Sequence, residues 1–158
     1  MDVPMVSTWL VLSDVFGLLG VSVCAYTDWR YRLVSETLIA AVAAAVLLCR
    51  YVAGGIPLAS GLVGAGGCLI PWAPAVFRGL ISRQRQAGMG DLELSALAGW
   101  TWGPVGGLLI LGIASVLALI VHGKHSARRR IPMGFYIGMA AVLLSVLLIG
   151  ATALPRGL

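Results

Sequence analysis

The chain has 158 residues, of which 59% are hydrophobic and only 11% charged, and its formal net charge is +5. A water-soluble domain of this length cannot bury so much apolar surface, because small folds leave a large fraction exposed. No basic stripe alternates with stacking aromatic side chains, which excludes a single-strand nucleic-acid binder and leaves no nucleic-acid partner to expect. Lipid must therefore solvate much of the chain, and its long unbroken apolar runs predict helices rather than a closed barrel.

Six apolar segments approach the length of about 20 residues that a helix needs to cross a bilayer. The first carries no positive region before it at Met1-Asp2-Val3-Pro4, so we expect it to remain as an anchor rather than be cleaved. The second ends at the turn signal of residues 54–57, and Pro71 and Pro74 predict a bend in the third. The segments cover about residues 7–26, 33–53, 58–77, 88–102, 105–121 and 131–153.

The fourth segment, which follows the polar stretch 78–86, is short. A helix of about 15 residues spans roughly 22 Å, against a hydrocarbon core of about 30 Å. We therefore expect it to begin below the membrane surface, with residues 88–91 lining a water-accessible notch. Together the segments predict an all-α membrane protein, a polytopic bundle of about six transmembrane helices that forms one domain over residues 1–158.

The basic residues predict the orientation of this bundle. Only Arg50 and Arg156 fall toward the side that holds both chain ends. The positive-inside rule therefore predicts a cytoplasmic (inner) membrane protein with both termini outside the cytoplasm. The loops after the first, third and fifth segments hold the remaining basic residues, which are Arg30, Arg32, Arg78, Arg83, Arg85, Lys124, Arg128, Arg129 and Arg130.

Two acids stand at the predicted cytoplasmic ends of apolar segments. Asp28 follows the first segment, and Asp91 lies in Gly88-Met89-Gly90-Asp91 at the start of the fourth. The topology places them at the same depth, so we expect adjacent helices to bring them together. Singly, each has a plainer interpretation: Asp91 would complement the helix dipole, and Asp28 would pair with Arg30 or Arg32. Intramembrane acids are nevertheless functional candidates by default.

Paired carboxylates in a low-dielectric site have a specific chemistry. They cannot both ionise easily, so they share a proton, and one acts as base while the other acts as acid. A water between them can then attack an amide carbonyl, as in aspartic proteases. Gly88 and Gly90 have no side chains, so a substrate backbone or another helix can approach Asp91. We predict Asp28 and Asp91 as catalytic residues, with Gly88 and Gly90 shaping the site.

Three stretches carry a resemblance to a known family. They are Asp28-Trp29-Arg30-Tyr31-Arg32, residues 88–94 with Gly-x-Gly-Asp, and residues 131–138 at the start of the last span. In their order and spacing the chain resembles the type IV prepilin peptidases, which are membrane aspartic proteases. The resemblance implies an intramembrane-type aspartic endopeptidase with Asp28 and Asp91 as its pair. It would act in type IV pilus assembly or protein secretion.

The same resemblance implies the substrate and partners. The enzyme would cut the short basic leader from type IV prepilin-like or pseudopilin-like precursors, just after a glycine, at the cytoplasmic face. Its partners would be that precursor and membrane lipid, and no cofactor is implied. Larger members also methylate the new terminus with a domain that carries Cys-x-x-Cys pairs. This chain has no such pair and resembles the short, peptidase-only members.

The chain departs from the family pattern in three places. Val34-Ser35-Glu36 stands where Ile-Pro-Asn is usual, Glu93 where Lys is common, and Phe135 where the family has a second proline. These departures motivate an alternative function, a non-catalytic membrane subunit of a pilus or secretion assembly. A small transporter is a weaker alternative, because transporters place charged groups near helix midpoints.

No motif predicts a metal site. The three cysteines, Cys24, Cys49 and Cys68, lie far apart in apolar stretches and are expected to be small buried residues. His122 and His125 have metal-ligand spacing, but their loop is basic and would repel a cation. We interpret that loop as an orienting segment that touches anionic lipid.

Overall fold

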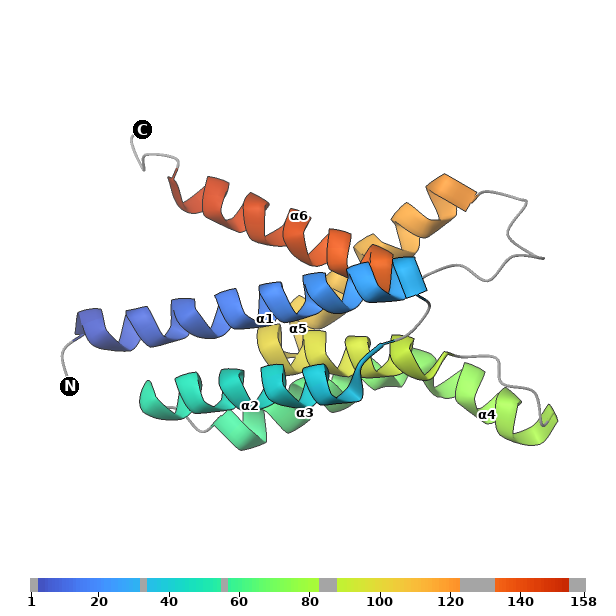
Figure 1. Ribbon diagram of the computed structural model, residues 1–158, viewed down its shortest axis with the longest axis horizontal. Coiled ribbons are helices and arrows are strands. Elements are labelled where there is room, and N and C mark those ends of the chain that lie inside the picture. Colours follow the sequence, from blue (N-terminus) through green and yellow to red (C-terminus); the bar gives the residue numbers. More distant parts are fainter. Residues whose placement is uncertain (1–2, 32–33, 55–56, 83–87, 123–132, 154–158) are drawn as a thin grey trace.

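The computed structural model describes residues 3–31, 34–54, 57–82, 88–122 and 133–153, and helices account for nearly all of them (Figure 1). The prediction of an all-α membrane bundle is confirmed. Three helical stretches are long and apolar enough to cross a membrane, Thr8–Tyr31, Leu58–Arg78 and Met89–His122, and Met133–Leu147 is a shorter apolar helix. The elements are α1 (Val3–Tyr31), α2 (Glu36–Val52), α3 (Pro57–Leu69), the 3-10 turn η1 (Ile70–Trp72), α4 (Ala73–Ser82), α5 (Met89–His122) and α6 (Met133–Ala153).

The α5 helix is broken in its middle, so it forms two arms. Gly103 adopts φ 73° and ψ 178°, a conformation that glycine tolerates, and Pro104 follows without a backbone N–H. We call residues 89–102 the first arm and residues 104–122 the second arm. In Figure 1 the second arm returns toward the end of the molecule where the first arm began. The predicted fourth and fifth segments are therefore separate helices, as expected.

The predicted bend in the third span is also present. Ile70, Pro71 and Trp72 form the 3-10 turn between α3 and α4, with Pro71 inside it. Proline lacks an amide hydrogen and clashes with the preceding helical turn, so a continuous α-helix cannot pass through it. The break turns α4 away from the line of α3 (Figure 1). It also sets the position of Trp72, which is important for the site described below.

Small residues allow the helices to cross closely. A Cβ added to Gly99 would lie 2.2 Å from the Gly64 carbonyl oxygen, and one added to Gly64 would lie 2.0 Å from that of Gly99. The first arm and α3 therefore touch backbone to backbone, as small residues permit in membrane proteins. On the other side of the bundle, a Cβ on Gly138 of α6 would lie 2.3 Å from Cβ of Ala25 in α1.

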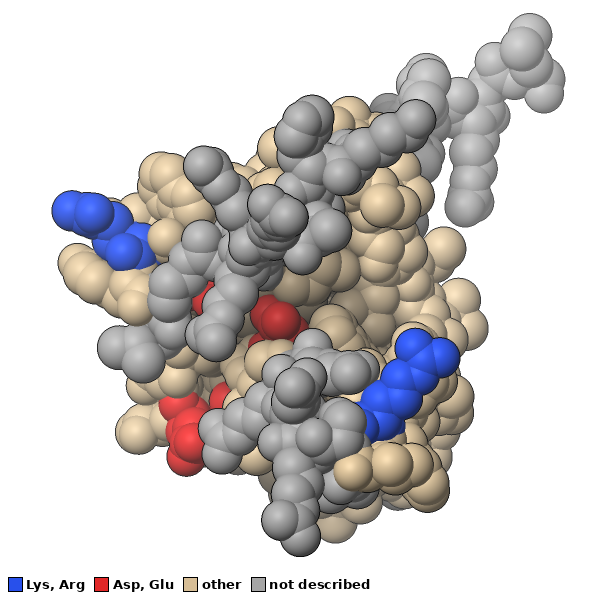
Figure 2. Space-filling model, turned by 90° about the vertical axis from the view of Figure 1, so that its right-hand side faces the viewer, with Lys and Arg blue, Asp and Glu red and all other residues tan. Residues whose placement is uncertain are grey.

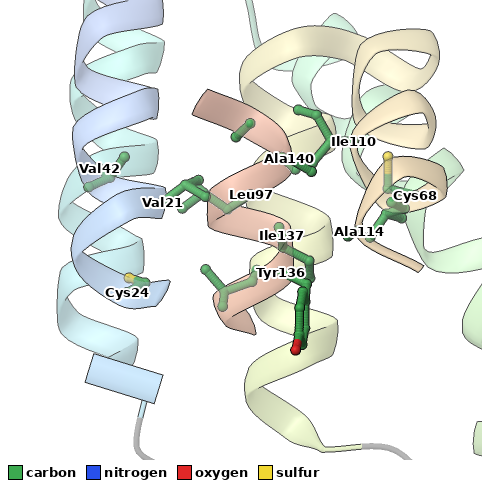
Figure 3. Close-up of a cluster of buried hydrophobic side chains, with 14 of the residues drawn as sticks. Val21, Cys24, Val42, Cys68, Leu97, Ile110, Ala114, Tyr136, Ile137 and Ala140 are labelled. Atoms are coloured by element: carbon green, nitrogen blue, oxygen red, sulfur yellow. The ribbon is translucent and has the colours of Figure 1, made fainter. Parts of the chain in front are cut away.

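A buried apolar cluster joins α1, both arms of α5, and α6 (Figure 3). The cluster contains one side chain that is at most 2% exposed from each of α1, the first arm, the second arm and α6: Val21, Leu97, Ile110 and Ile137. This cluster holds the ends of the helices that carry the candidate acids in fixed relation to one another. All three cysteines are buried and free, as expected for small residues in helices.

Several residues used in the sequence predictions lie outside the described part of the chain, so the structure does not test them. They include most of the basic residues behind the predicted orientation and one of the two histidines. They are Arg32, Arg83, Arg85, Lys124, His125, Arg128, Arg129, Arg130, Ile131, Pro132 and Arg156.

Candidate active site

Four helix ends meet at one end of the bundle. The last turn of α1 and the first turns of α2, the first arm and α6 all lie toward the right-hand side of Figure 1. Figure 2 views the molecule from that side and shows acidic side chains inside and beside a hollow, with basic side chains farther out. The candidate acids belong to these helix ends, so the fold brings them to one face.

Asp91 lies in the first turn of α5 and is partly buried. Its carboxylate accepts a hydrogen bond from the backbone N–H of Gly134 at the start of α6, and it interacts electrostatically with Asp28. A Cβ added to Gly88 would lie 3.0 Å from Asp91 Oδ2. Gly88 therefore lies directly beside this carboxylate.

Asp28, in the last turn of α1, lies against the same glycine of α6. A Cβ added to Gly134 would lie 2.8 Å from Asp28 Oδ2 and 3.1 Å from its Cγ. Gly134 thus contacts one acid through its Cα side and binds the other through its amide. The structure therefore brings Asp28 and Asp91 together around a single glycine that sequence reasoning did not single out.

Gly90 lets the loop before α2 approach the first arm. A Cβ at this position would lie 2.6 Å from Cγ2 of Val34. The next residue, Ser35, is the N-cap of α2 and accepts a hydrogen bond of 3.3 Å from the Leu38 N–H. Serine is a preferred N-cap residue. The departure at Val34-Ser35-Glu36 therefore has a structural role in starting α2 beside Asp91.

Aromatic side chains and an apolar groove flank the acids. The rings of Trp29 and Phe135, which neighbour Asp28 and Gly134 in sequence, lie 5.6 Å apart between centroids. The groove has a volume of about 470 Å³ and runs between α1 and α6. Its lining includes Tyr26, Trp29, Phe135, Met139, Val142 and Leu143. The site is therefore bordered by apolar surface on its α1 and α6 side.

Glu93 follows Asp91 by two residues in α5 but interacts with other side chains. It interacts with Glu36 at the start of α2 and with Cys24 of α1. Residues two apart on a helix point in different directions, which separates Glu93 from Asp91. Among the described residues, no group of three or more His, Cys, Asp or Glu side chains could hold a metal ion.

Sequence reasoning missed two polar clusters. Arg50 donates from Nε to Ser13 Oγ at 3.1 Å, from one Nη to the Trp100 carbonyl at 3.2 Å, and from the other to the Thr101 carbonyl. Asp14 of α1 interacts electrostatically with Arg50. The signal was present, because Asp14 is a charged residue inside the first apolar run.

The second missed cluster joins the break in the third span to the first arm. Trp72 Nε1 donates to Ser95 Oγ at 3.0 Å, and Ser95 Oγ donates to the Asp91 carbonyl at 2.6 Å.

His122, which the sequence analysis placed in the basic loop, is the last residue of α5 and contacts α6. Its Nδ1 lies 3.2 Å from the hydroxyl of Tyr136, and the two rings meet edge to face.

Comparison with known proteins places these elements in a family context. The model of the type IV leader peptidase family matches residues 15–123, more than two thirds of the chain. The match contains Asp28, both arms of α5 with Asp91, and the intervening helices, and it ends before α6. No curated protein and no solved structure matches the chain.

Proposed function

The chain belongs to the type IV leader peptidase family, and we propose that it is an aspartic endopeptidase with Asp28 and Asp91 as its catalytic pair. Its substrates are type IV prepilin-like or pseudopilin-like precursors, from which it removes the leader at the cytoplasmic face of the inner membrane. Membership of the family supports a leader peptidase in general. The acid pair, the precursor class and the orientation are the specific parts of the proposal.

The contact of both acids with Gly134 is the observation that carries the proposal. The amide of this residue binds the Asp91 carboxylate, and its Cα side lies against the Asp28 carboxylate. The acids come from two different helices, α1 and α5, and each is partly buried. Like charges in such a site favour a single shared proton, because both carboxyl groups cannot ionise easily together.

The proposed reaction follows from that arrangement. The ionised member of the pair takes a proton from a water held between the two carboxyl groups, and the water attacks the scissile carbonyl carbon. The protonated member donates its proton to the carbonyl oxygen, where negative charge develops. The C–N bond then breaks as the first acid protonates the leaving amine and one hydroxyl of the tetrahedral intermediate returns its proton to the second acid, which leaves a carboxylic acid product and a singly protonated pair. Gly88 leaves the space beside the Asp91 carboxylate free of a side chain of its own, and Gly90 makes room for Val34 beside the first turn of α5.

The test compares Asp28→Asn and Asp91→Asn with wild type on a co-expressed precursor that carries a short basic leader ending in glycine. Asparagine keeps the shape of aspartate but cannot act as a base, so we expect cleavage to fall by about a thousandfold or more. Asp14→Asn is the matched control, because Asp14 is an acid on the same helix that faces Arg50 instead. Cleavage by Asp14→Asn should stay near wild type.

Full processing by either of the first two variants would refute the acid pair. If wild type itself cleaves none of several precursors but binds a pilus or secretion complex, the non-catalytic subunit is the correct function. Membrane insertion of every variant should be verified by fractionation, so that loss of protein is not mistaken for loss of cleavage.

A further inference from the structure

We infer that Trp72 and Ser95 are positioning residues that hold the first turn of α5, and with it Asp91, in place for the reaction. The inference rests on the proposed function for its catalytic consequence. Its structural consequence, a more protected first turn, is measurable independently of any activity.

Trp72 reaches the first arm because the third span is broken. Pro71 interrupts the helix, and Trp72 closes the 3-10 turn with its side chain partly buried. Its indole N–H, which is a donor only, bonds to Ser95 Oγ at 3.0 Å. A straight helix through residues 70–72 would change the direction of this side chain. The break therefore lets the turn between α3 and α4 hydrogen-bond to the first arm one turn after Asp91.

Ser95 passes this contact on to Asp91. Its side chain is fully buried, and its Oγ donates to the Asp91 carbonyl at 2.6 Å. A hydroxyl has one proton to donate. Because Trp72 uses Ser95 as an acceptor, that proton is directed to the Asp91 carbonyl. The two bonds thus form a continuous chain from the break in the third span to the backbone of the candidate catalytic acid.

The first turn of α5 needs such support. Helix ends fray, and glycine within a helix destabilises it relative to alanine. Two of the residues around Asp91 are the glycines at 88 and 90, and the Leu92 N–H to Gly88 carbonyl bond is long, at 3.3 Å. Gly90, which lies within the first turn, therefore weakens it, and the buried hydroxyl of Ser95 offsets that weakness by its bond to the Asp91 carbonyl.

Loss of the two hydrogen bonds that link Trp72, Ser95 and the Asp91 carbonyl should lower turnover rather than substrate affinity. A shift of about 1 Å in a catalytic group can cost about a hundredfold in rate, and the two hydrogen bonds reach Asp91 through its backbone carbonyl. We expect Trp72→Phe and Ser95→Ala each to lower kcat about tenfold and to change KM less than twofold. The kcat of the double variant should be no lower than that of the slower single variant, because each substitution already interrupts the same pair of linked hydrogen bonds.

Ser115→Ala is the matched control. Ser115 makes the same type of bond, from Oγ to the carbonyl four residues earlier, at 2.8 Å to Leu111. It lies in the second arm, which does not carry Asp91. This variant should keep the kcat and KM of wild type. The substrate is a reporter precursor with a basic leader that ends in glycine, followed by an apolar segment, assayed with the purified protein in detergent micelles.

Hydrogen exchange separates the inference from the proposed function. The amides of residues 92–95, whose hydrogen bonds to the carbonyls of residues 88–91 close this turn, should exchange at least several-fold faster in Trp72→Phe and Ser95→Ala than in wild type or Ser115→Ala. Unchanged exchange would overturn the inference even if the protein cleaves the reporter. Faster exchange in an enzyme that does not cleave the reporter would leave the inference standing and count against the proposed function. Equal losses of kcat in all three variants would also overturn it, because they would indicate a general loss of structure.

Discussion

The two ends of the first arm of α5 meet opposite requirements. At its N-terminal end Asp91 faces a second acid, and at its C-terminal end the carbonyls of Trp100 and Thr101 bind the guanidinium of Arg50. Both arrangements complement the helix dipole, which favours negative charge at the first turn and positive charge at the last. Only the N-terminal arrangement also places two like charges, Asp28 and Asp91, close together. One end therefore stabilises the arm, while the other accepts an electrostatic cost that suits a reactive site.

The Arg50 end also solves a problem of membrane depth. In Figure 1 the first arm ends short of the far ends of α1 and α2, and the backbone turns back at that point. The last carbonyls of a helix have no partner within it, and unsatisfied groups in the hydrocarbon are costly. Arg50 supplies donors to two of these carbonyls and to Ser13. The short fourth segment noticed in the sequence thus ends inside the bundle, and Arg50 makes that possible.

The largest expected effect comes from removing this cation. Arg50→Leu should destabilise the protein by about 3 kcal/mol, since it leaves two carbonyls and the buried Ser13 hydroxyl without their charged donor. Unfolding in detergent micelles measures the change. Arg50→Lys retains the charge but not the planar set of donors, so it should fall between wild type and Arg50→Leu. Wild-type stability in Arg50→Leu would show that the two ends do not differ as described.

The next effect tests the acid end. Gly134→Ala should lower cleavage about 10- to 100-fold, because the added methyl would lie 2.8 Å from Asp28 Oδ2 and 2.7 Å from Leu94 Cδ1. A kinetic assay on the reporter precursor measures it. Gly112→Ala is the control, since an added Cβ there meets nothing within 4 Å. Equal activity of the two variants would contradict the close contact of Gly134 with the acids.

The smallest effect concerns the approach of α2 to the first arm. Gly90→Ala should lower cleavage only a few-fold, because its Cβ would meet the side chain of Val34, at 2.6 Å, rather than a rigid backbone. Adding Val34→Ala should restore most of the activity by removing that collision. Gly66→Ala, with open space around the added Cβ, is the control. If the double variant cleaves no faster than Gly90→Ala, the collision with Val34 is not the cause of the lost activity.

The candidate site was only partly predictable. Asp28, Asp91, Gly88 and Gly90 were recognised because they stand at segment ends, where the order of apolar and polar residues is visible in the chain. Trp72 and Ser95 carry no such mark, since a tryptophan and a serine are common in membrane helices. Gly134 does stand at a segment end, but nothing in the sequence distinguishes it from its neighbours in the stretch 131–138. Their roles depend on contacts between positions 23 to more than 100 residues apart.

The sequence by itself determined that the chain forms helices in lipid, the order of these helices along the chain, and that Pro71 breaks the third span. These properties depend on local composition, since lipid leaves the backbone no partner but its own helix. Only the tertiary structure decided which faces meet. The long helices α1, α5 and α6 are apolar all round, so no periodic pattern marks an inward side. The close fit of small residues sets the packing instead, and with it the meeting of two acids around Gly134.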